Sequence, residues 1–393
     1  MRTRRTKRRS RVPLVILLCI AALAALLYSP PGRAPLTTAP ALDLFQAEPE
    51  IRVLLRTLKP SESLTSGDAD QTLSAAGSAA TLPAKSVLTW NGQQLVWGSV
   101  ALRLPARVHA AATQRIELSD GSWPGELELL QEGQQLQAIL HIPLENYLAG
   151  VVQAEMGPAF ADAALEAQAI ASRSYAAHQM ASHRSRAFDV DTTQLTQVLR
   201  GDRLAGRKVR RAVELTRGLV LSFEGRVLEG VFSATCGGHT RSSGEAFGGH
   251  TPAPLAGTQC GHCRAAPFYE WTASRERNEV ASALGCGDID GIGGLSFTAG
   301  ERLASVVVHT ASGPISISGS RMKRALGPSA RSTWITQLEM DGTQIRAIGR
   351  GFGHGVGLCQ HGAGQLARRS GWSVEAILSH YYPGARLARL YVP

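Results

Sequence analysis

The chain has 393 residues, 44% hydrophobic and 18% charged, which is enough to bury one large core or two smaller ones. Its 41 glycines and 19 prolines indicate a globular, loop-rich protein rather than a disordered or collagen-like one. The net charge of +10 comes mostly from seven Lys and Arg within residues 1–11, and the remaining 34 basic and 31 acidic residues nearly balance, which argues against a nucleic-acid partner.

The N-terminus has the pattern of an export signal. Residues 1–12 are basic, and residues 13–28 form an uncharged apolar run, so the rest of the chain is expected to be exported. The run is short for a spanning helix and long for a signal-peptide core, which leaves a signal anchor and a cleaved signal peptide open. We favour the anchor because no small-x-small cleavage site follows closely. The sequence therefore predicts an extracytoplasmic protein, anchored in the membrane or secreted.

After this segment, residues 29–47 are rich in Pro and Ala and predict a linker before one domain over residues 48–393. Residues 51–55 predict a buried strand and residues 61–80 a loop insertion. Short β patterns separated by turn signals then predict strands at residues 87–90, 94–97, 127–130 and 136–142.

Helix formers at three-to-four spacing predict one long helix over residues 161–181. Further helices are expected at residues 206–216, 276–284, near Met322 and at 364–369, and strands at 219–223, 227–232, 304–310, 314–318, 333–340 and 344–350. The predicted class is α+β, a mixed β-rich domain with a long helix after the Glu155 turn and a Gly/His-rich loop lining a groove.

Glu155 is the most informative carboxylate. An apolar segment, residues 147–154, precedes it, and apolar surroundings raise the pKa of a carboxylic acid so that it can hold a proton near neutrality. A general acid needs that property. The alternative is a carboxylate at a helix entry that accepts from free N–H groups.

Residues 349–364 carry an unusually dense run of glycines. Such density usually marks a close approach of the backbone to another group, so we expect His354, Gln360 and His361 to line a groove. The run lacks the Lys and the strand context of a phosphate-binding loop. A plain glycine-rich turn with hydrogen-bonded histidines is the alternative.

The cysteines suggest a metal site. Cys236 and His239 form a CxxH pair, and Cys260 and Cys263 form a CxxC pair, a spacing that suits structural Zn²⁺, with His262 as a substitute for His239. In an exported protein a disulfide from Cys236 to Cys260 or Cys263 is the rival. Cys286 and Cys359 have no evident sequence partner and are expected to be simply buried. A thiol-redox role is weaker, because no thioredoxin-like context surrounds the CxxC.

Five motifs together resemble one known family. They are VQAEM (residues 152–156), EAQAIASRSYA (166–176), SATCGGHT (233–240), GRGFGHGVGLCQHGA (349–363) and HYYPGA (380–385). In this order they are similar to the stage II sporulation protein D family, also called the SpoIID/LytB or amidase-enhancer domain. The likeness runs from about Glu48 to Leu390.

The resemblance implies a peptidoglycan substrate. Sporulation members are lytic transglycosylases that cleave glycan strands stripped of their stem peptides, and other members are described as amidase enhancers. The likeness places the catalytic acid and base at Glu155 with no cofactor required, because the sugar's own C6 hydroxyl attacks and leaves a 1,6-anhydro end. We infer from position and polarity that Arg173, His354, Gln360 and His361 bind the glycan.

The likeness is incomplete at the suggested metal site. Several relatives have a histidine where this chain has Ser233, and some use it with cysteines to hold zinc. Because the family has both kinds of member, the resemblance leaves two functions open. One is a glycan-cleaving enzyme, and the other is a non-catalytic wall-binding enhancer of an N-acetylmuramoyl-L-alanine amidase.

Overall fold

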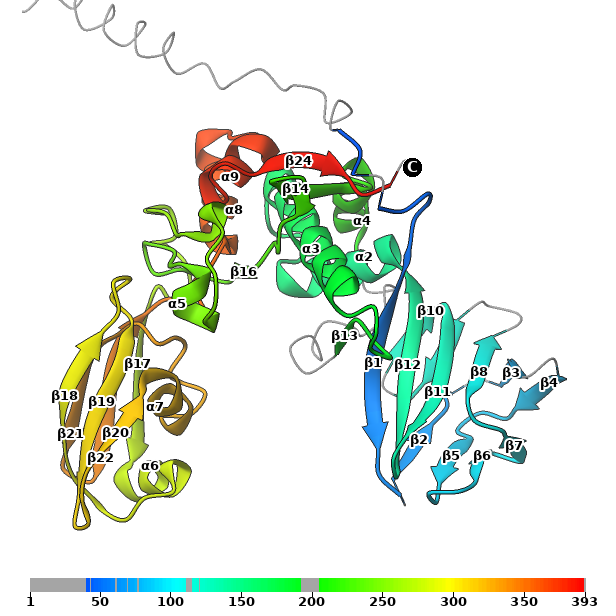
Figure 1. Cartoon of the computed structure of the whole chain (residues 1–393), viewed down its shortest axis with the longest axis horizontal. Helices are drawn as coiled ribbons and strands as arrows, with labels where there is room; N and C mark the ends of the chain where they lie inside the picture. The colour runs from blue at the N-terminus through cyan, green and yellow to red at the C-terminus, as the bar shows by residue number, and fades with distance from the viewer. Residues whose placement is uncertain are drawn as a thin grey trace, which may run out of the picture. The chain divides into compact units, whose positions relative to one another are not determined.

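The computed structural model describes residues 40–42, 44–60, 62–68, 70–75, 78–110, 115–119, 121–191 and 205–391. These residues combine helices with several small sheets, which confirms the predicted α+β class (Figure 1). The predicted signal segment, residues 1–28, lies outside the described residues. Among the described helices, none is long and apolar enough to cross a membrane.

The N-terminal part of the fold is made of short antiparallel strands. They are β1 (Glu50–Leu58), β2 (Ser63–Thr65), β3 (Gln71–Ala75), β4 (Ser78–Leu82), β5 (Val87–Trp90), β6 (Leu95–Trp97), β7 (Val100–Leu102), β8 (Ala106–Ala110), β9 (Arg115–Leu118), β10 (Gly121–Pro124), β11 (Glu126–Glu132) and β12 (Gln135–Pro143). A seven-stranded sheet has the order β13-β1-β12-β11-β8-β3-β4, in which β13 (Val190–Asp191) comes from further along the chain, and β2-β5-β6-β7 form a second sheet. Strand β12 is buried at consecutive positions from Leu136 to Ile142, so side chains on both of its faces are covered.

The loop insertion predicted over residues 61–80 is wrong. Strands β2, β3 and the start of β4 occupy it, and β3 pairs with both β4 and β8. The polar composition suggested a loop, but a strand near a sheet edge needs few apolar residues because its neighbours supply the backbone hydrogen bonds.

A mainly helical segment with a few short strands follows these strands in the chain. It contains α2 (Leu144–Glu155), α3 (Asp162–Ser182), β13 (Val190–Asp191), α4 (Arg207–Leu215), β14 (Leu219–Phe223), β15 (Arg226–Val227), β16 (Phe232–Ser233), α5 (Ser243–Phe247) and the short 3₁₀ helix η3 (Ala253–Leu255). Helix α3 confirms the predicted long helix, and its many alanines let α2, α4, β14 and the C-terminal helices pack closely around it (Figure 1). Helix α2 was expected only as an apolar segment.

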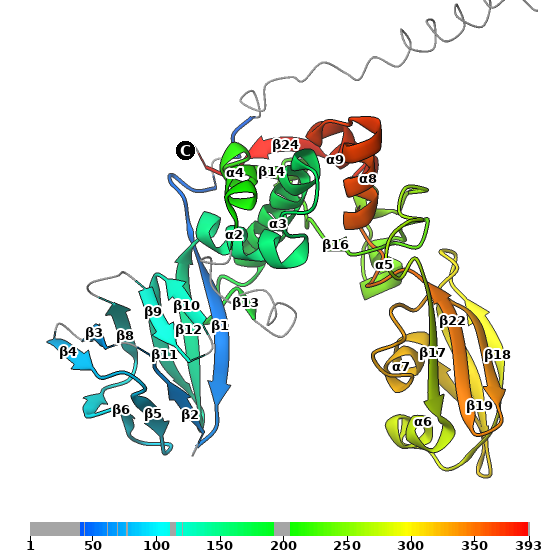
Figure 2. The same ribbon diagram turned by 180° about the vertical axis from the view of Figure 1, so that it is seen from behind.

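Residues 270–350 form a unit with its own hydrophobic core. It consists of β17 (Glu270–Glu276), α6 (Arg277–Leu284), β18 (Ile289–Phe297), β19 (Leu303–Thr310), β20 (Gly313–Ser318), α7 (Gly319–Ala325), β21 (Ile335–Asp341) and β22 (Gln344–Arg350). Both views show α6 and α7 beside its strands (Figures 1 and 2). Buried residues on both sides of it, such as Cys263 and Val356, belong to a larger hydrophobic core, which we call the first core. We therefore call residues 270–350 the inserted unit.

The C-terminal part is β23 (Leu358–Cys359), α8 (Gln360–Ser370), α9 (Val374–Tyr381) and β24 (Arg386–Arg389). Strand β24 pairs with β14, and on its other side the backbone of Arg389 bonds Pro40 and Leu42. Backbone pairing therefore begins earlier in the chain than the predicted boundary at Glu48.

Candidate functional site

Glu155 is the last residue of α2 and lines a pocket. The helix ends there because Met156 N–H and Gly157 N–H both donate to the Val152 carbonyl, with Gly157 at a φ of +69°. The alternative reading of Glu155 as a helix-entry carboxylate is wrong. A negative charge at the C-terminal end of a helix is unfavourable, which favours the protonated form of Glu155.

A chain of hydrogen bonds holds the Glu155 carboxyl. Gln360 Nε2 donates to Glu155 Oε2 at 2.9 Å and lies 3.4 Å from Gln168 Oε1, while Gln168 Nε2 donates to Ser172 Oγ at 2.9 Å. Burial raises the pKa of Glu155, and the hydrogen bond from Gln360 opposes that shift without cancelling it. The net result is a carboxyl that holds its proton to a higher pH than a solvated glutamate.

Gln360 reaches Glu155 because two distant segments pair. Strand β16 lies parallel to β23, with Ser233 opposite Cys359, and Gln360 follows as the first residue of α8. Gln360 is 2% exposed and is not among the residues that line the pocket. In this structure its amide contacts Glu155, and its predicted contact with glycan stays a prediction.

The pocket beside Glu155 has a volume of about 490 Å³. Its lining includes Tyr147, Tyr175, Glu155, Glu229, Phe247 and His354, together with the further carboxylates of Asp189 and Asp191. Burial raises the pKa of both tyrosines, so they stay protonated and can act as hydrogen-bond donors. A pocket with apolar walls and a few convergent polar groups is typical of a small-molecule or sugar site.

No role was predicted from the sequence for four pocket residues, namely Tyr147, Tyr175, Glu229 and Phe247. Tyr147 lies within the apolar segment before Glu155, and Tyr175 lies within the helix motif, so a local signal existed for both. Glu229 and Phe247 had none. Glu229 accepts from Gln179 Nε2 at 3.1 Å, which holds its carboxylate in the pocket wall.

His354 lines the pocket, as predicted for the glycine-rich run. Burial lowers its pKa to about 4, so the ring is neutral near pH 7. Its Nδ1 accepts from Val356 N–H at 3.1 Å, and the ring also bonds the backbone of Phe232. Because both ring nitrogens are hydrogen-bonded to backbone groups, His354 presents a neutral ring to the pocket. Phe247 packs against this ring, with 5.1 Å between the two ring centroids.

Two other predicted glycan-binding residues lie elsewhere. Arg173 is fully buried, with its guanidinium paired to Glu145 at 2.7 and 2.8 Å and bonded to the carbonyls of Leu219 and Val213. Its predicted contact with glycan is wrong, because the Arg173 side chain faces the core. The prediction had assumed that this long polar side chain lies on the surface of α3. His361 packs on Phe160 at 5.3 Å and is not among the pocket-lining residues.

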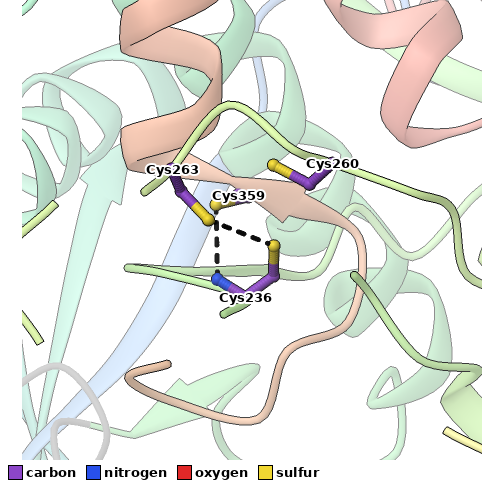
Figure 3. Close-up of side chains that lie close together, drawn as sticks. All are labelled: Cys236, Cys260, Cys263 and Cys359. Carbon is purple, nitrogen blue, oxygen red and sulfur yellow. Dashed lines mark hydrogen bonds between the residues drawn. The ribbon is translucent and has the colours of Figure 1, made fainter. Parts of the chain in front are cut away.

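Four buried cysteines gather at the N-terminal end of α8. The Sγ atoms of Cys236, Cys260, Cys263 and Cys359 all lie within 4.8 Å of one another (Figure 3). We call them the cysteine cluster. Four converging thiols can hold a metal ion such as zinc, which prefers tetrahedral sulfur ligands.

The predicted ligand set is corrected at one position. Cys359 is the fourth member in place of His239, which instead forms a backbone bridge with Gln259. His262 is exposed and packs near Trp372 and His380, so His262 does not take the place of His239 as a ligand either. Cys359 was expected to be simply buried. No local spacing could have revealed it, since 123 positions separate it from Cys236.

The cysteines are free thiols in this structure, with Cys236 and Cys263 Sγ atoms 3.6 Å apart, well beyond disulfide bond length. A nearby arginine fits an anionic cluster. Arg302 is 1% exposed, donates to the Cys236 carbonyl at 2.9 Å, and has a buried Nε with no partner in the described part of the chain. Burial lowers its pKa to about 10, so it is charged near neutrality.

No carboxylate lies within 4 Å of the Arg302 guanidinium among the described residues. A divalent ion held by four thiolates carries a net negative charge, and that charge would offset the buried guanidinium. The four cysteine ligands and the buried Arg302 charge, which has no carboxylate partner among the described residues, therefore both fit a metal ion bound by thiolates.

Comparison with known proteins places the chain in a family. A family profile described as stage II sporulation protein matches residues 132–223. Stage II sporulation protein D of Bacillus amyloliquefaciens is 31% identical over 270 residues, which cover 64% of this chain and 76% of the relative. The chain belongs to the SpoIID family. Within the family it is 29% identical over 268 residues to stage II sporulation protein D of Bacillus subtilis, covering 64% of this chain and 76% of the relative.

A third relative is the amidase enhancer of Bacillus subtilis, 25% identical over 291 residues. The match covers 61% of this chain and 40% of that protein. Both family names that the sequence motifs suggested are thus found among the relatives.

Proposed function

We propose that this SpoIID family member is a peptidoglycan lytic transglycosylase that acts outside the cytoplasm on glycan strands, with Glu155 as acid and base. The observation that carries the proposal is a carboxyl with a raised pKa in the wall of a pocket of about 490 Å³. The relatives named for sporulation and for amidase enhancement support a role at the cell wall.

The contacts of Glu155 suggest how the proton is handled. Gln360 donates to Oε2 and so favours negative charge on that atom, while Oε1 has no hydrogen-bond partner among the described residues. The proton is therefore expected on Oε1, from which it passes to the glycosidic oxygen. As the bond breaks, the Gln360 N–H stabilises the new carboxylate, which then takes the proton of the attacking C6 hydroxyl.

The pocket walls suit a sugar. Phe247, 56% exposed, offers an aromatic face for pyranose C–H groups, and the hydroxyls of Tyr147 and Tyr175 offer hydrogen bonds. We assign the cysteine cluster to a structural zinc ion. Its residue Cys359 directly precedes Gln360, so a rigid cluster would hold Gln360 against Glu155.

The test compares the full chain with its Glu155→Gln variant on peptide-free glycan strands, with products analysed by mass spectrometry. Wild type should release 1,6-anhydro-ended fragments, and the variant should lose at least about a thousandfold of the rate, because it keeps the shape and loses the proton. Glu50→Gln, an exposed carboxylate at the start of β1, is a matched control.

Other products would change the assignment. Reducing ends would indicate hydrolysis, with another carboxylate of the pocket, such as Glu229, as the second catalytic group. No products from a folded protein that binds glycan would contradict an enzymatic role. That outcome would favour the alternative, a non-catalytic enhancer of an N-acetylmuramoyl-L-alanine amidase.

A further inference from the structure

Two exposed phenyl rings and a half-buried arginine form a platform that the proposed reaction does not use. The rings of Phe268 and Phe352 lie 5.6 Å apart between centroids at 84°, and the two residues are 41% and 37% exposed. The Arg331 guanidinium carbon lies 4.2 Å from the centroid of Phe268 and 5.3 Å from that of Phe352. We call these three residues the Phe-Arg platform.

The backbone holds the platform next to the pocket. Phe352 exchanges two hydrogen bonds with Thr235, at 2.7 and 3.2 Å, and Gly353 N–H donates to the Arg331 carbonyl at 3.1 Å. The next residue is His354, which lines the pocket beside Glu155. Because the platform is already ordered, a ligand that binds it loses little entropy in ordering these groups.

Arg331 has donors available for a ligand. Among the described residues, no carboxylate lies within 4 Å of its guanidinium, and its side chain donates no hydrogen bond. Stacking on the phenyl rings uses a face of the guanidinium and leaves the N–H groups at its edge open. That edge can bind a carboxylate through two parallel hydrogen bonds, while the rings pack against the apolar face of a sugar.

We propose that the Phe-Arg platform is a subsite for a carboxylate-bearing sugar of the glycan strand, and this rests on the function proposed above. Muramic acid carries a lactyl ether whose carboxyl is an amide when a stem peptide is attached and a free carboxylate when it is absent. Arg331 pairs with the free carboxylate and has no charge to pair with in the amide. The platform thereby selects peptide-free strands by charge.

The test measures binding, so it does not depend on turnover. The full-length Glu155→Gln protein is titrated with a peptide-free tetrasaccharide of N-acetylglucosamine and N-acetylmuramic acid, and with the same tetrasaccharide after its lactyl carboxyls are converted to methylamides. The free acid should bind about tenfold more tightly, as expected for a partly exposed charge-assisted pair. Adding Arg331→Gln should make the two affinities equal.

Matched variants separate charge from shape. Arg324→Gln removes an exposed arginine of α7 in the same inserted unit and should keep the tenfold ratio. Arg331→Lys keeps the charge without the planar fork and should give an intermediate ratio. Because the readout is a ratio of two affinities, a partial loss of folded protein does not imitate the effect.

Three results would overturn the subsite. They are equal affinities for the two sugars in the Glu155→Gln protein, a ratio unchanged by Arg331→Gln, and no binding of either sugar. The second is also the result expected if the platform contacts a protein partner instead. A protein that prefers the free acid through Arg331 yet yields no cleavage products would keep the subsite and reject the lytic activity.

Discussion

At the scale of single residues, the Glu155 carboxyl is governed by two opposing effects. Burial raises its pKa and the hydrogen bond from Gln360 lowers it, with burial the larger. An acid catalyst must be protonated to act, so the proposed activity is expected to fall as the pH rises through the pKa of Glu155. Gln360 therefore both orients the carboxyl and limits how far its pKa rises.

We expect Gln360→Met to shift the alkaline limb of the pH–rate profile to higher pH. The variant removes the hydrogen bond that stabilises the charged form, so the pKa of Glu155 rises further. The maximal rate should fall about tenfold, since the new carboxylate loses its N–H donor. Measuring kcat/KM against pH checks this. An unshifted limb would mean that Glu155 is not the titrating acid.

Arg173 is also understood at this scale, as a structural cation. Burial alone would raise the pKa of Glu145, but the charge and hydrogen bonds of Arg173, with a further bond from Tyr391, lower it overall. A carboxylate with a lowered pKa stabilises the fold above its unfolded pKa, and that stabilisation is lost as the pH falls through the folded pKa.

Accordingly, Arg173→Met should lower the free energy of unfolding by about 3–5 kcal/mol at pH 7, because it leaves the Glu145 charge buried and unpaired. The difference from wild type should shrink as the solution is acidified and Glu145 becomes protonated. Urea denaturation at several pH values measures both. Arg346→Met, from an exposed pair with Asp341, is the control and should cost less than about 1 kcal/mol.

At the scale of elements, helix α8 links the cysteine cluster to Glu155. Cys359 precedes the helix and Gln360 is its first residue. Gly362, in its first turn, has no room for a side chain. A Cβ there would lie 2.1 Å from Tyr381 Oη, 2.8 Å from Cys260 Sγ and 3.2 Å from Cys359 Sγ.

Gly362→Ala should therefore displace α8 from the cluster. We expect a loss of about 1–3 kcal/mol of stability from overpacking, together with weaker zinc binding. Thermal unfolding with and without zinc measures both effects. Gly287→Ala, where a Cβ would meet nothing within 4 Å, should leave both unchanged. A variant as stable as wild type would show that α8 can shift without cost.

At the scale of the whole molecule, the cysteine cluster joins segments that are distant in sequence. Cys236, Cys260 and Cys263 precede the inserted unit, and Cys359 follows it. The inserted unit has its own core, so we expect its folding to depend little on the cluster. Metal binding is expected to stabilise the first core by closing this long loop.

We expect Cys359→Ser to abolish the binding of about one zinc per chain, and His239→Ala to leave it intact. Elemental analysis of the purified proteins measures the metal. In the Cys359→Ser protein, hydrogen exchange should quicken in β16 and α8 but not in β19–β22, which belong to the separate core. Zinc lost in the His239→Ala protein would restore the ligand set predicted from the sequence.

Local sequence patterns determined much of the fold. Strands β5 and β22 begin and end where they were predicted, and helices α3 and α4 lie within a residue of their predicted ends. Periodicity and helix propensity are properties of neighbouring residues, so they are readable without a tertiary structure. The motifs also identified the SpoIID family, and the apolar segment before Glu155 indicated its raised pKa.

Only the tertiary structure decided which distant residues meet. The pairing of β16 with β23 brings Cys359 to Cys236 and Gln360 to Glu155, and α3 turns Arg173 towards Glu145 in the core. Neither contact leaves a local trace, because a side chain's partner is set by how separate segments pack. The type of a residue limits its chemistry, and its neighbours in space decide which part of that chemistry is used.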